Sequence, residues 1–188
     1  MKPKELNPNM LILLDSPVVS SLITMIRHGD TPNRLAAVLQ APFIGTEAIP
    51  ALGIVFASTN VGASKAACEA IKRIVMNAGR PGAKTESVAA SAALLKLAAP
   101  SNPRTVRADA IQWLGYVGGA EEAEALAGML SDDDVRDDCI MAIERIPGIE
   151  VDGILKKHAR GSNSKVQAAV NLALRHRHIS LKDVGVKK

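Results

Sequence analysis

The sequence predicts an all-α protein built from repeated helices, and two observations carry this prediction. First, apolar residues recur at steps 0, +4, +5 and +8 in several segments, and the clearest of these follow one another with a period of roughly 30 residues, which marks a repeat architecture. Second, aromatic residues make up only 2% of the chain, so the core has to be built from Ala, Leu, Ile and Val, which suits closely packed helices. Few β-branched or aromatic residues alternate with a period of two, so strands have little support.

The clearest repeats lie between residues 102 and 178. Three segments carry the template: Val106, Ala110, Ile111 and Leu114; Val135, Cys139, Ile140 and Ile143; and Val166, Val170 and Leu174. Asx or Ser before these segments and Gly after them are the expected start and stop signals of helices, and Asp132 to Asp134 read as caps. We therefore expect three long helices with shorter partners over 121–130 and 151–159, the last long helix ending near His176. Five residues should be buried: Ile111, Leu114, Ile140, Ile143 and Leu174.

The upstream part of the chain is less regular. A first helix should begin at Ser16-Pro17 and end at Gly29, with Val18, Leu22, Ile23 and Ile26 on the template. Further helices are predicted over 31–40 (ended by Pro42), 46–58, 63–77 and 85–98. The helices that contain Val18 and Val106 carry the same template, so both should be the same member of a helix pair. If first and second helices alternate strictly from Val18 onward, however, the helix of Val106 falls on the other member. We therefore expect one helix too many or too few within 31–98.

Several motifs resemble HEAT-like repeats of the phycobilisome-lyase type. They are Pro17-Val18, Asp134-Val135-Arg136 and the run from Val106-Arg107 to Leu114-Gly115. The resemblance implies antiparallel helix pairs stacked into a right-handed α-solenoid, here of about five repeats. It also implies that Arg107 and Arg136 pair with an acid of a neighbouring turn. Such repeats serve scaffolds, nucleic-acid binders and a few enzymes, so the resemblance implies a fold and not a function.

The expected domain organisation is an N-terminal tail over 1–14, a single repeat domain over 15–178 and a basic C-terminal tail over 179–188. The apolar run Met10–Leu14 is too short for a signal-peptide core or a membrane span. Cys68 and Cys139 are unclustered and lie in helical patterns, where a small buried hydrophobe is the favoured interpretation. We expect a soluble cytoplasmic protein that does not contact membranes.

No constellation of residues predicts catalysis. The loop Gly79–Thr85 resembles a phosphate-binding loop but has Ala83 before the Lys and no preceding strand. His176 and His178 stand two residues apart and would not share a helix face as metal ligands. Asp109 and Trp113 could lie along one side of a helix, as acids and aromatics do in HEAT-like DNA glycosylases, but core packing is the favoured interpretation for Trp113. We predict no enzyme activity, no catalytic residue, no metal and no cofactor.

Charge is distributed unevenly along the second half of the chain. Residues 119–155 hold eleven acids against two bases, whereas residues 156–188 hold nine bases against one acid. Charged helix faces are often merely solvated, but a basic end also suits an acidic partner. Six residues are candidates for partner binding: Lys156, Lys157, Arg160, Lys165, Arg175 and Arg177. The first four should cluster, and Arg175 and Arg177 should project at the opposite end of the last helix.

These observations leave three functional hypotheses. The first is a non-catalytic scaffold or adaptor that binds a partner protein on a concave face lined by the second helices of the pairs. The second is a nucleic-acid-binding α-solenoid that uses the basic C-terminal end, and it predicts a steep dependence on salt. The third is a lyase-like enzyme on the same scaffold. The identity of the partner and the oligomeric state stay open.

Overall fold

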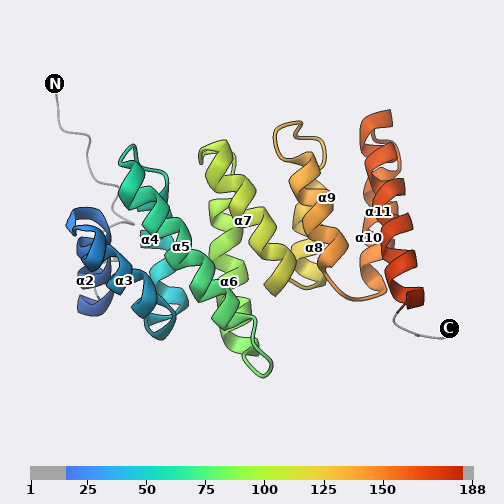
Figure 1. Cartoon of the computed structure of the whole chain (residues 1–188). Coiled ribbons are helices and arrows are strands. Elements are labelled where there is room, and N and C mark those ends of the chain that lie inside the picture. The colour runs from blue at the N-terminus through green and yellow to red at the C-terminus, as the bar shows by residue number, and fades with distance from the viewer. Residues whose placement is uncertain (1–15, 184–188) are drawn as a thin grey trace. The chain divides into compact units, whose positions relative to one another are not determined.

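A computed structural model describes residues 16–183, with side chains described up to residue 178. These residues form ten α-helices and one 3-10 turn and contain no strand, which confirms the all-α prediction (Figure 1). The elements are α2 (Pro17–His28), α3 (Thr31–Ile44), η1 (Thr46–Ala48), α4 (Ile49–Phe56), α5 (Val61–Ala78), α6 (Lys84–Leu97), α7 (Arg104–Val117), α8 (Ala120–Gly128), α9 (Arg136–Arg145), α10 (Glu150–Ala159) and α11 (Ser164–Asp183). The tail predicted over 1–14 lies outside the described residues.

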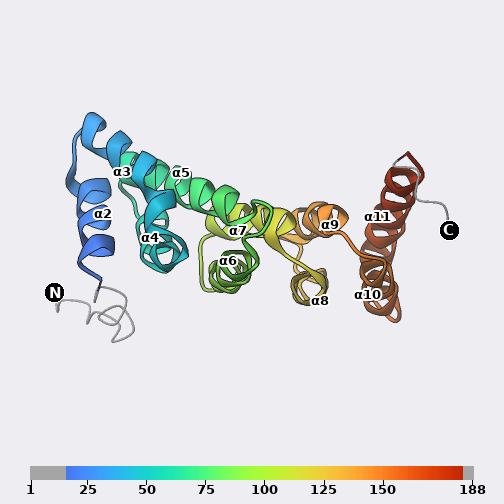
Figure 2. The ribbon, with the colours of Figure 1, turned by 90° about the horizontal axis from the view of Figure 1, so that it is seen from below.

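The chain divides into two compact units, residues 1–93 (unit 1) and 94–188 (unit 2). In unit 1, α3 and α5 pack side by side in a first layer, and α2 and α4 form a second layer (Figure 2). In unit 2, the first layer holds α7, α9 and α11, and the second holds α8 and α10. Helices therefore alternate between two layers within each unit. The single repeat domain over 15–178 stays a prediction.

The expected irregularity within 31–98 is wrong, and its origin is the register of α2. Val18 is 57% exposed, and the neighbouring Val19 is buried together with Leu22, Ile23 and Ile26. The apolar stripe of α2 thus starts one residue later than the template requires. Because α2 packs beside α4, it belongs to the second layer. Counted in this way, the helices alternate along the chain without an extra or a missing one.

Three predicted helix boundaries differ from the structure. Pro42 lies inside the last turn of α3, which continues to Ile44, because a proline there removes only one helical hydrogen bond near an end that frays anyway. The predicted helix over 46–58 begins as the 3-10 turn η1 and continues as α4, with Pro50 in the first turn. At the other end of the chain, α11 passes His176 and continues to Asp183, since no Gly or Pro interrupts it before Gly185.

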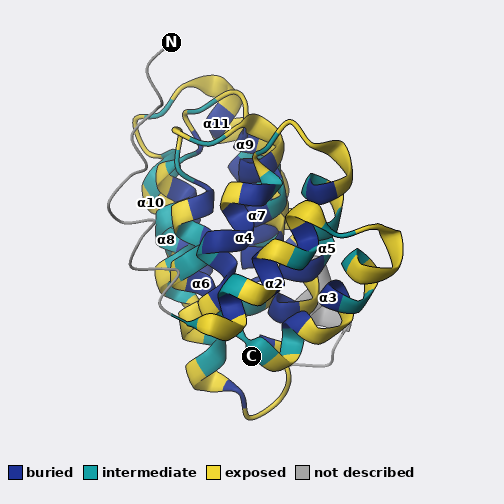
Figure 3. Cartoon of the chain, turned by 90° about the vertical axis from the view of Figure 1, so that its left-hand side faces the viewer, coloured by how far each residue is buried: buried dark blue, intermediate teal, exposed yellow. Residues whose placement is uncertain are grey.

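The core of each unit lies between its two layers, where the helix faces turned toward their neighbours carry the buried residues (Figure 3). The template identifies these residues well in unit 2, because Ile111, Leu114, Ile140 and Ile143 are all buried as predicted. Leu174 is the exception and is only half-buried. Trp113 is buried, which confirms its interpretation as a core residue.

Gly115 allows α7 and α9 to approach closely. A Cβ atom added at Gly115 would meet the Cα and carbonyl O atoms of Ala142 at 3.0 Å. Any larger side chain at this position would have to push the two helices apart. At this position the backbones of α7 and α9, and not only their side chains, come close together.

A series of equivalent side chains closes the junctions between successive helices. Arg34 Nε donates to the Ile26 carbonyl (3.0 Å), Ser64 Oγ to Phe56 (2.6 Å), Arg107 Nε to Ala98 (3.2 Å) and Arg136 Nε to Leu130 (2.7 Å). Each donor lies in the first turn of a first-layer helix and binds a carbonyl at or just beyond the end of the preceding helix. Such carbonyls have no partner inside their own helix, so these "junction donors" satisfy them. Gln167, at the corresponding place in α11, donates to Ser162 in the preceding loop (2.8 Å).

The acids before α9 serve the junctions and do not cap the helix. The helix begins at Arg136, and no side chain caps its first turn. Asp132 accepts from Arg107 Nη2 through one oxygen (2.5 Å) and from its own turn, at Asp134 N, through the other (3.0 Å). Arg136 pairs with Asp133. The acid partners implied by the resemblance are therefore present for both arginines, and the predicted capping role is wrong.

No helix within residues 16–183 is both long and apolar enough to cross a membrane.

Candidate protein-binding face

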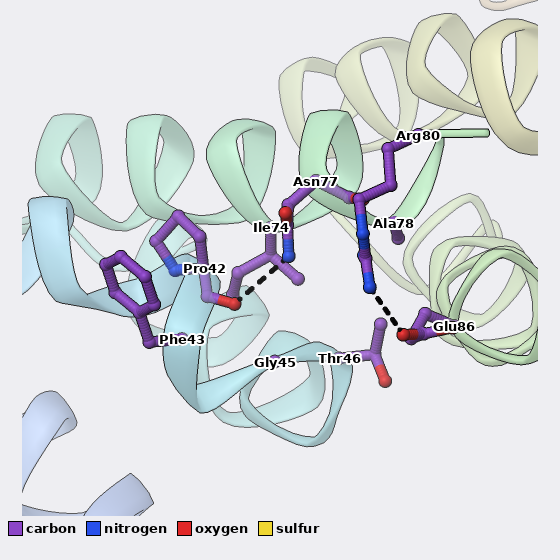
Figure 4. A pocket seen from close by; sticks show the side chains of 9 residues that line it. All are labelled: Pro42, Phe43, Gly45, Thr46, Ile74, Asn77, Ala78, Arg80 and Glu86. Atoms are coloured by element: carbon purple, nitrogen blue, oxygen red, sulfur yellow. Dashed lines mark hydrogen bonds and ion pairs between the residues drawn. The ribbon is translucent and has the colours of Figure 1, made fainter. Parts of the chain in front are cut away.

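The described residues contain no group of three His, Cys, Asp or Glu side chains that could hold a metal ion. The loop that resembles a phosphate-binding loop joins α5 to α6, and Arg80 is held in place there. Its guanidinium pairs with Glu86 (2.9 Å) and donates to the Asn77 carbonyl (2.8 Å) beside a hollow of about 290 Å³ (Figure 4). Asn77 in turn donates to the Pro42 carbonyl (3.3 Å), so the polar groups of this hollow connect α3, α5 and α6. They act as ties between helices.

The predicted basic cluster lies at one end of the α10–α11 pair. Lys156 and Lys157 are in the last turn of α10, Arg160 follows it, and Lys165 is in the first turn of α11. All four are exposed. Lys157 binds Glu124 of α8 (2.5 Å), and Glu124 also contacts His158 (2.9 Å). The hydrogen bond from Lys157, followed by that from His158, lowers the pKa of Glu124, so the charge of Lys157 is already matched within the protein.

Arg177 does not project from the end of α11, and this part of the prediction is wrong. Its guanidinium is buried and binds Asp152 of α10 (Nε to Oδ1, 2.8 Å). It also donates to four carbonyls at the end of α9: Ile143 (3.0 Å), Glu144 (3.3 Å), Ile146 (2.6 Å) and Gly148 (2.8 Å). A guanidinium has five N–H donors, and the end of α9 supplies acceptors that its own helix cannot satisfy. Arg177 therefore joins α9, α10 and α11, and of the two arginines near that end Arg175 is the exposed one.

The first layer of unit 2 presents a different surface, which the template did not identify. Because α7, α9 and α11 lie side by side, residues at equal steps from the template start fall into rows across them. Step +6 places Gln112, Met141 and Leu172 in one row, and step +10 places Tyr116, Arg145 and His176 in the next. All six are exposed, and the exposed fractions of Tyr116, Met141 and Leu172 are 52%, 47% and 50%. We call these six residues the Tyr116 face.

Contacts between neighbouring helices hold this face in place. The Arg145 guanidinium lies 5.4 Å from the centre of the Tyr116 ring, a cation–π distance. His176 Nδ1 lies 3.1 Å from Glu144 Oε1, and Arg104 pairs with Asp138 (2.7 Å) at the edge of the face. Tyr, Met and Arg are enriched where proteins bind proteins, and side chains already held in position lose less entropy on binding. The Tyr116 face is therefore a candidate protein-binding surface.

The second layer of unit 2 presents charged side chains at its surface. Its exposed or half-exposed side chains include Glu121 and Glu124 on α8 and Lys156 and Lys157 on α10. Among the described residues of this layer, the large exposed apolar side chain is that of Ile149, which directly precedes α10. The second helices were expected to form the partner surface, but in unit 2 the rows of exposed apolar side chains lie on the first helices. A search of the sequence for apolar residues at the non-template steps +6 and +10 would have found them.

Compared with known protein families and with curated proteins, the sequence matches no family model and no curated protein.

Proposed function

We propose that the protein is a non-catalytic helical-repeat adaptor that binds a partner protein through the Tyr116 face. The observation that carries this proposal is the row of exposed Met141 and Leu172 beside Tyr116 on three neighbouring helices. Scattered apolar residues on a surface need no explanation, but rows across adjacent helices form a continuous patch. Tyr and Arg are both among the residue types enriched at the positions that dominate binding energy.

The junction donors support the finer description of the fold as an α-solenoid of about five repeats, and the resemblance to HEAT-like repeats implies its right-handed sense. Such a donor, or Gln167 in its place, occurs in α3, α5, α7, α9 and α11, so five first helices follow the same local plan. Each of these hydrogen bonds joins a helix to the helix or loop directly before it, which is the nearest-neighbour logic of repeat proteins. We also propose a cytoplasmic location. It fits the two unclustered cysteines of the sequence. Burial raises the pKa of the Cys139 thiol to about 12, so this thiol is unreactive.

Nucleic-acid binding at the basic end ranks second. Lys156, Arg160 and Lys165 are exposed and form no ion pair with any described residue, which favours an acidic ligand. Lys157 is matched by Glu124, however, and Arg177 is buried, so fewer charges face solvent than the sequence predicts. Arg175 lies about 15 Å along α11 from Lys165, at 1.5 Å per residue, so it does not extend the cluster.

The test compares what immobilised variants retain from a lysate of the native host. Wild type should retain a specific protein at a salt concentration that removes nucleic acid, and Met141→Asp/Leu172→Asp should lose it. Met76→Asp, which changes an exposed methionine of α5 in the same way, is the matched control and should keep it. The dissociation constant of the purified partner should then rise at least about tenfold for the double variant, as the loss of an interface anchor predicts.

Two results would overturn this proposal. Retention of the same proteins by the double variant would remove the Tyr116 face from the binding site. Loss of the partner in Lys156→Glu/Lys165→Glu, with duplex DNA bound at physiological salt by the wild type alone, would favour the basic end and nucleic acid.

A further inference from the structure

The Tyr116 face contains an apolar row with a regular spacing. Met141 of α9 and Leu172 of α11 belong to this row, and Gln112 continues it on α7. α9 packs against both α7 and α11, so it lies between them (Figure 1). The axes of packed helices are about 8–10 Å apart. A binding element that crosses the three helices therefore needs a side chain for the row about every 8–10 Å.

An α-helix laid across the row meets this requirement. Residues seven apart lie on the same side of an α-helix and are about 10.5 Å apart along its axis. Side chains on one side of a β-strand recur about every 6.6–6.8 Å, so they would not keep step with the row. Every third residue of a polyproline II segment recurs at about 9.3 Å and would also fit the spacing. Such segments are bound in grooves lined by aromatic side chains, however, whereas this row consists of Met, Leu and Gln.

Charges of opposite sign lie on the two sides of the row. On α9, Asp137 is four residues before Met141 and Arg145 is four residues after it, and both are exposed. Each is about 6 Å from Met141 along the helix axis, so about 12 Å separate the two charges along α9. The diameter of an α-helix with its side chains is about 10–12 Å. A helix centred on the row would therefore place one flank over the acid and the other over the base.

The acidic side of the row extends from α9 toward α7. Next to Asp137 lies Asp138, which is half-buried and pairs with Arg104 of α7 (2.7 Å). Asp109 of α7 occupies the step that is equivalent to that of Asp138. Asp137 is thus the exposed acid of α9 on this side, and the carboxylates beside it keep the local charge negative toward α7.

The basic side of the row extends from α9 toward α11. Arg145 of α9 and Arg175 of α11 are both exposed, and their steps from the template start differ by one residue. Glu144, an acid on this side, is half-buried, and its Oε1 atom lies 3.1 Å from His176 Nδ1. The basic side therefore presents the guanidinium groups of Arg145 and Arg175 to a partner.

We propose that the partner presents an amphipathic α-helix that lies across α7, α9 and α11, an inference that rests on the proposed function of the Tyr116 face. Its apolar side chains contact the row, its basic flank faces Asp137, and its acidic flank faces Arg145 and Arg175. Binding of an amphipathic helix through regularly spaced apolar anchors is a recurring mode of recognition. From the axis of α7 to that of α11 the distance is about 16–20 Å, which about 11–14 helical residues span.

Photo-cross-linking in the full-length protein tests this inference on the partner that the wild type retains. A diazirine side chain replaces Met141 in one variant, Leu172 in a second and Gln112 in a third. Each variant is irradiated in a lysate of the native host, and mass spectrometry identifies the partner residue that is attached at each position. A diazirine in place of Met76, an exposed residue of α5, is the matched control and should not label the same partner segment.

The expected result is a single partner segment in which the residues linked to positions 112, 141 and 172 follow one another about seven residues apart. A separation of about three residues would show an extended or polyproline II segment and would overturn the inference. Links to segments distant in the partner's sequence would show a folded surface and would also overturn it. In both cases the Tyr116 face would still be the binding site. Retention that is unchanged in Met141→Asp/Leu172→Asp would instead overturn the proposed function, and this inference with it.

Reversal of the charges tests the orientation of the helix. Arg145→Glu/Arg175→Glu should raise the dissociation constant of the purified partner about tenfold at low salt, because two attractions become repulsions. Lys156→Glu/Lys165→Glu changes the net charge by the same amount where α10 meets α11, and it should change the constant by less than about twofold. Lysines in place of the acidic residues of the cross-linked segment should restore binding to Arg145→Glu/Arg175→Glu. Binding by Arg145→Glu/Arg175→Glu as tight as that of the wild type would overturn the inference.

Discussion

Units 1 and 2 build the same helix junction with different chemistry. In unit 1 the junction donors are Arg34 and Ser64, both half-buried, and Ser91 is the buried polar residue among those described. In unit 2 the donors are the buried Arg107 and Arg136, and the buried pair Asp152–Arg177 adds a further connection. A neutral or hydrated donor can be lost at a moderate cost, whereas a buried charge that loses its partner is expensive. Unit 2 is therefore more tightly connected and more sensitive to single substitutions.

The largest effect should follow from Arg177→Met. The substitution leaves Asp152 buried without its cation and removes donors from four carbonyls at the end of α9, so unit 2 should lose about 3–5 kcal/mol of unfolding free energy. Denaturant unfolding together with hydrogen exchange would measure the loss and locate it in unit 2. The matched substitution in unit 1, Arg34→Met, should cost clearly less. Equal losses of unfolding free energy for Arg177→Met and Arg34→Met would contradict the comparison. Arg177→Lys should restore little of the lost stability, because an ammonium group cannot reach all the acceptors.

The next effect is the loss of unfolding free energy when a core side chain is shortened, and it should be similar in both units. Leu114→Ala in α7 and Leu52→Ala in α4 each remove a completely buried side chain, and each should cost about 2–5 kcal/mol through lost burial and a residual cavity. Hydrogen exchange should place each loss in its own unit. A loss within experimental error for Leu114→Ala would show that the register of α7 is shifted.

A smaller effect should follow from Ser64→Ala, which removes the neutral junction donor of unit 1. The Phe56 carbonyl would lose its 2.6 Å hydrogen bond, but the half-buried site allows water to replace the hydroxyl, so we expect about 0.5–1.5 kcal/mol. Thermal unfolding by circular dichroism would measure it. Ser21→Ala, at an exposed position of α2, serves as a control for the change of residue type. A cost as large as that of Arg177→Met would contradict the view that unit 1 tolerates the loss of a donor.

The smallest effect should be a dependence on acid that is stronger in unit 2. The hydrogen bond from Arg107 lowers the pKa of Asp132, and that from Arg136 lowers the pKa of Asp133. Both carboxylates are then more acidic in the folded than in the unfolded protein. Their contribution is complete above the ordinary aspartate pKa of about 4 and is lost as the pH falls below it.

Hydrogen exchange between pH 5 and pH 3 would compare the two units. In unit 1 the pKa of Glu86 is also lowered, first by a backbone hydrogen bond and then by Arg80, so unit 1 should respond too, but less. Asp132→Asn/Asp133→Asn should weaken the response of unit 2, in which Glu124 keeps its own contribution, and should leave unit 1 unchanged. A steeper response in unit 1 would reverse the comparison.

The sequence predicted the core of unit 2 because its long helices keep one register. Val106 and Val135, Ile111 and Ile140, and Leu114 and Ile143 occupy equivalent positions 29 residues apart, and all six are buried. The same reasoning failed by one residue in α2, because an apolar pair such as Val18-Val19 allows two registers and only packing against α3, α4 and α5 selects one.

The charged residues were harder to predict, because their roles depend on contacts distant in sequence. Nothing near Arg177 in the sequence indicates that it binds Asp152 and the end of α9, so it was assigned to the surface with its neighbour Arg175. The Tyr116 face was missed for a related reason. Its three large apolar members, Tyr116, Met141 and Leu172, come from three different helices, so no single helix shows the pattern.

The placement of Trp113 has a consequence for optical measurements. It is the single tryptophan of the sequence, and the single tyrosine, Tyr116, lies on the same helix. Both fluorophores therefore lie in α7 of unit 2, and the buried indole will shift its emission when its surroundings open to water. Intrinsic fluorescence reports on one half of the chain, while far-ultraviolet ellipticity reports on all helices. If the two signals give different unfolding temperatures, the two halves of the chain unfold as separate events. The comparison can be made on the native protein without a label.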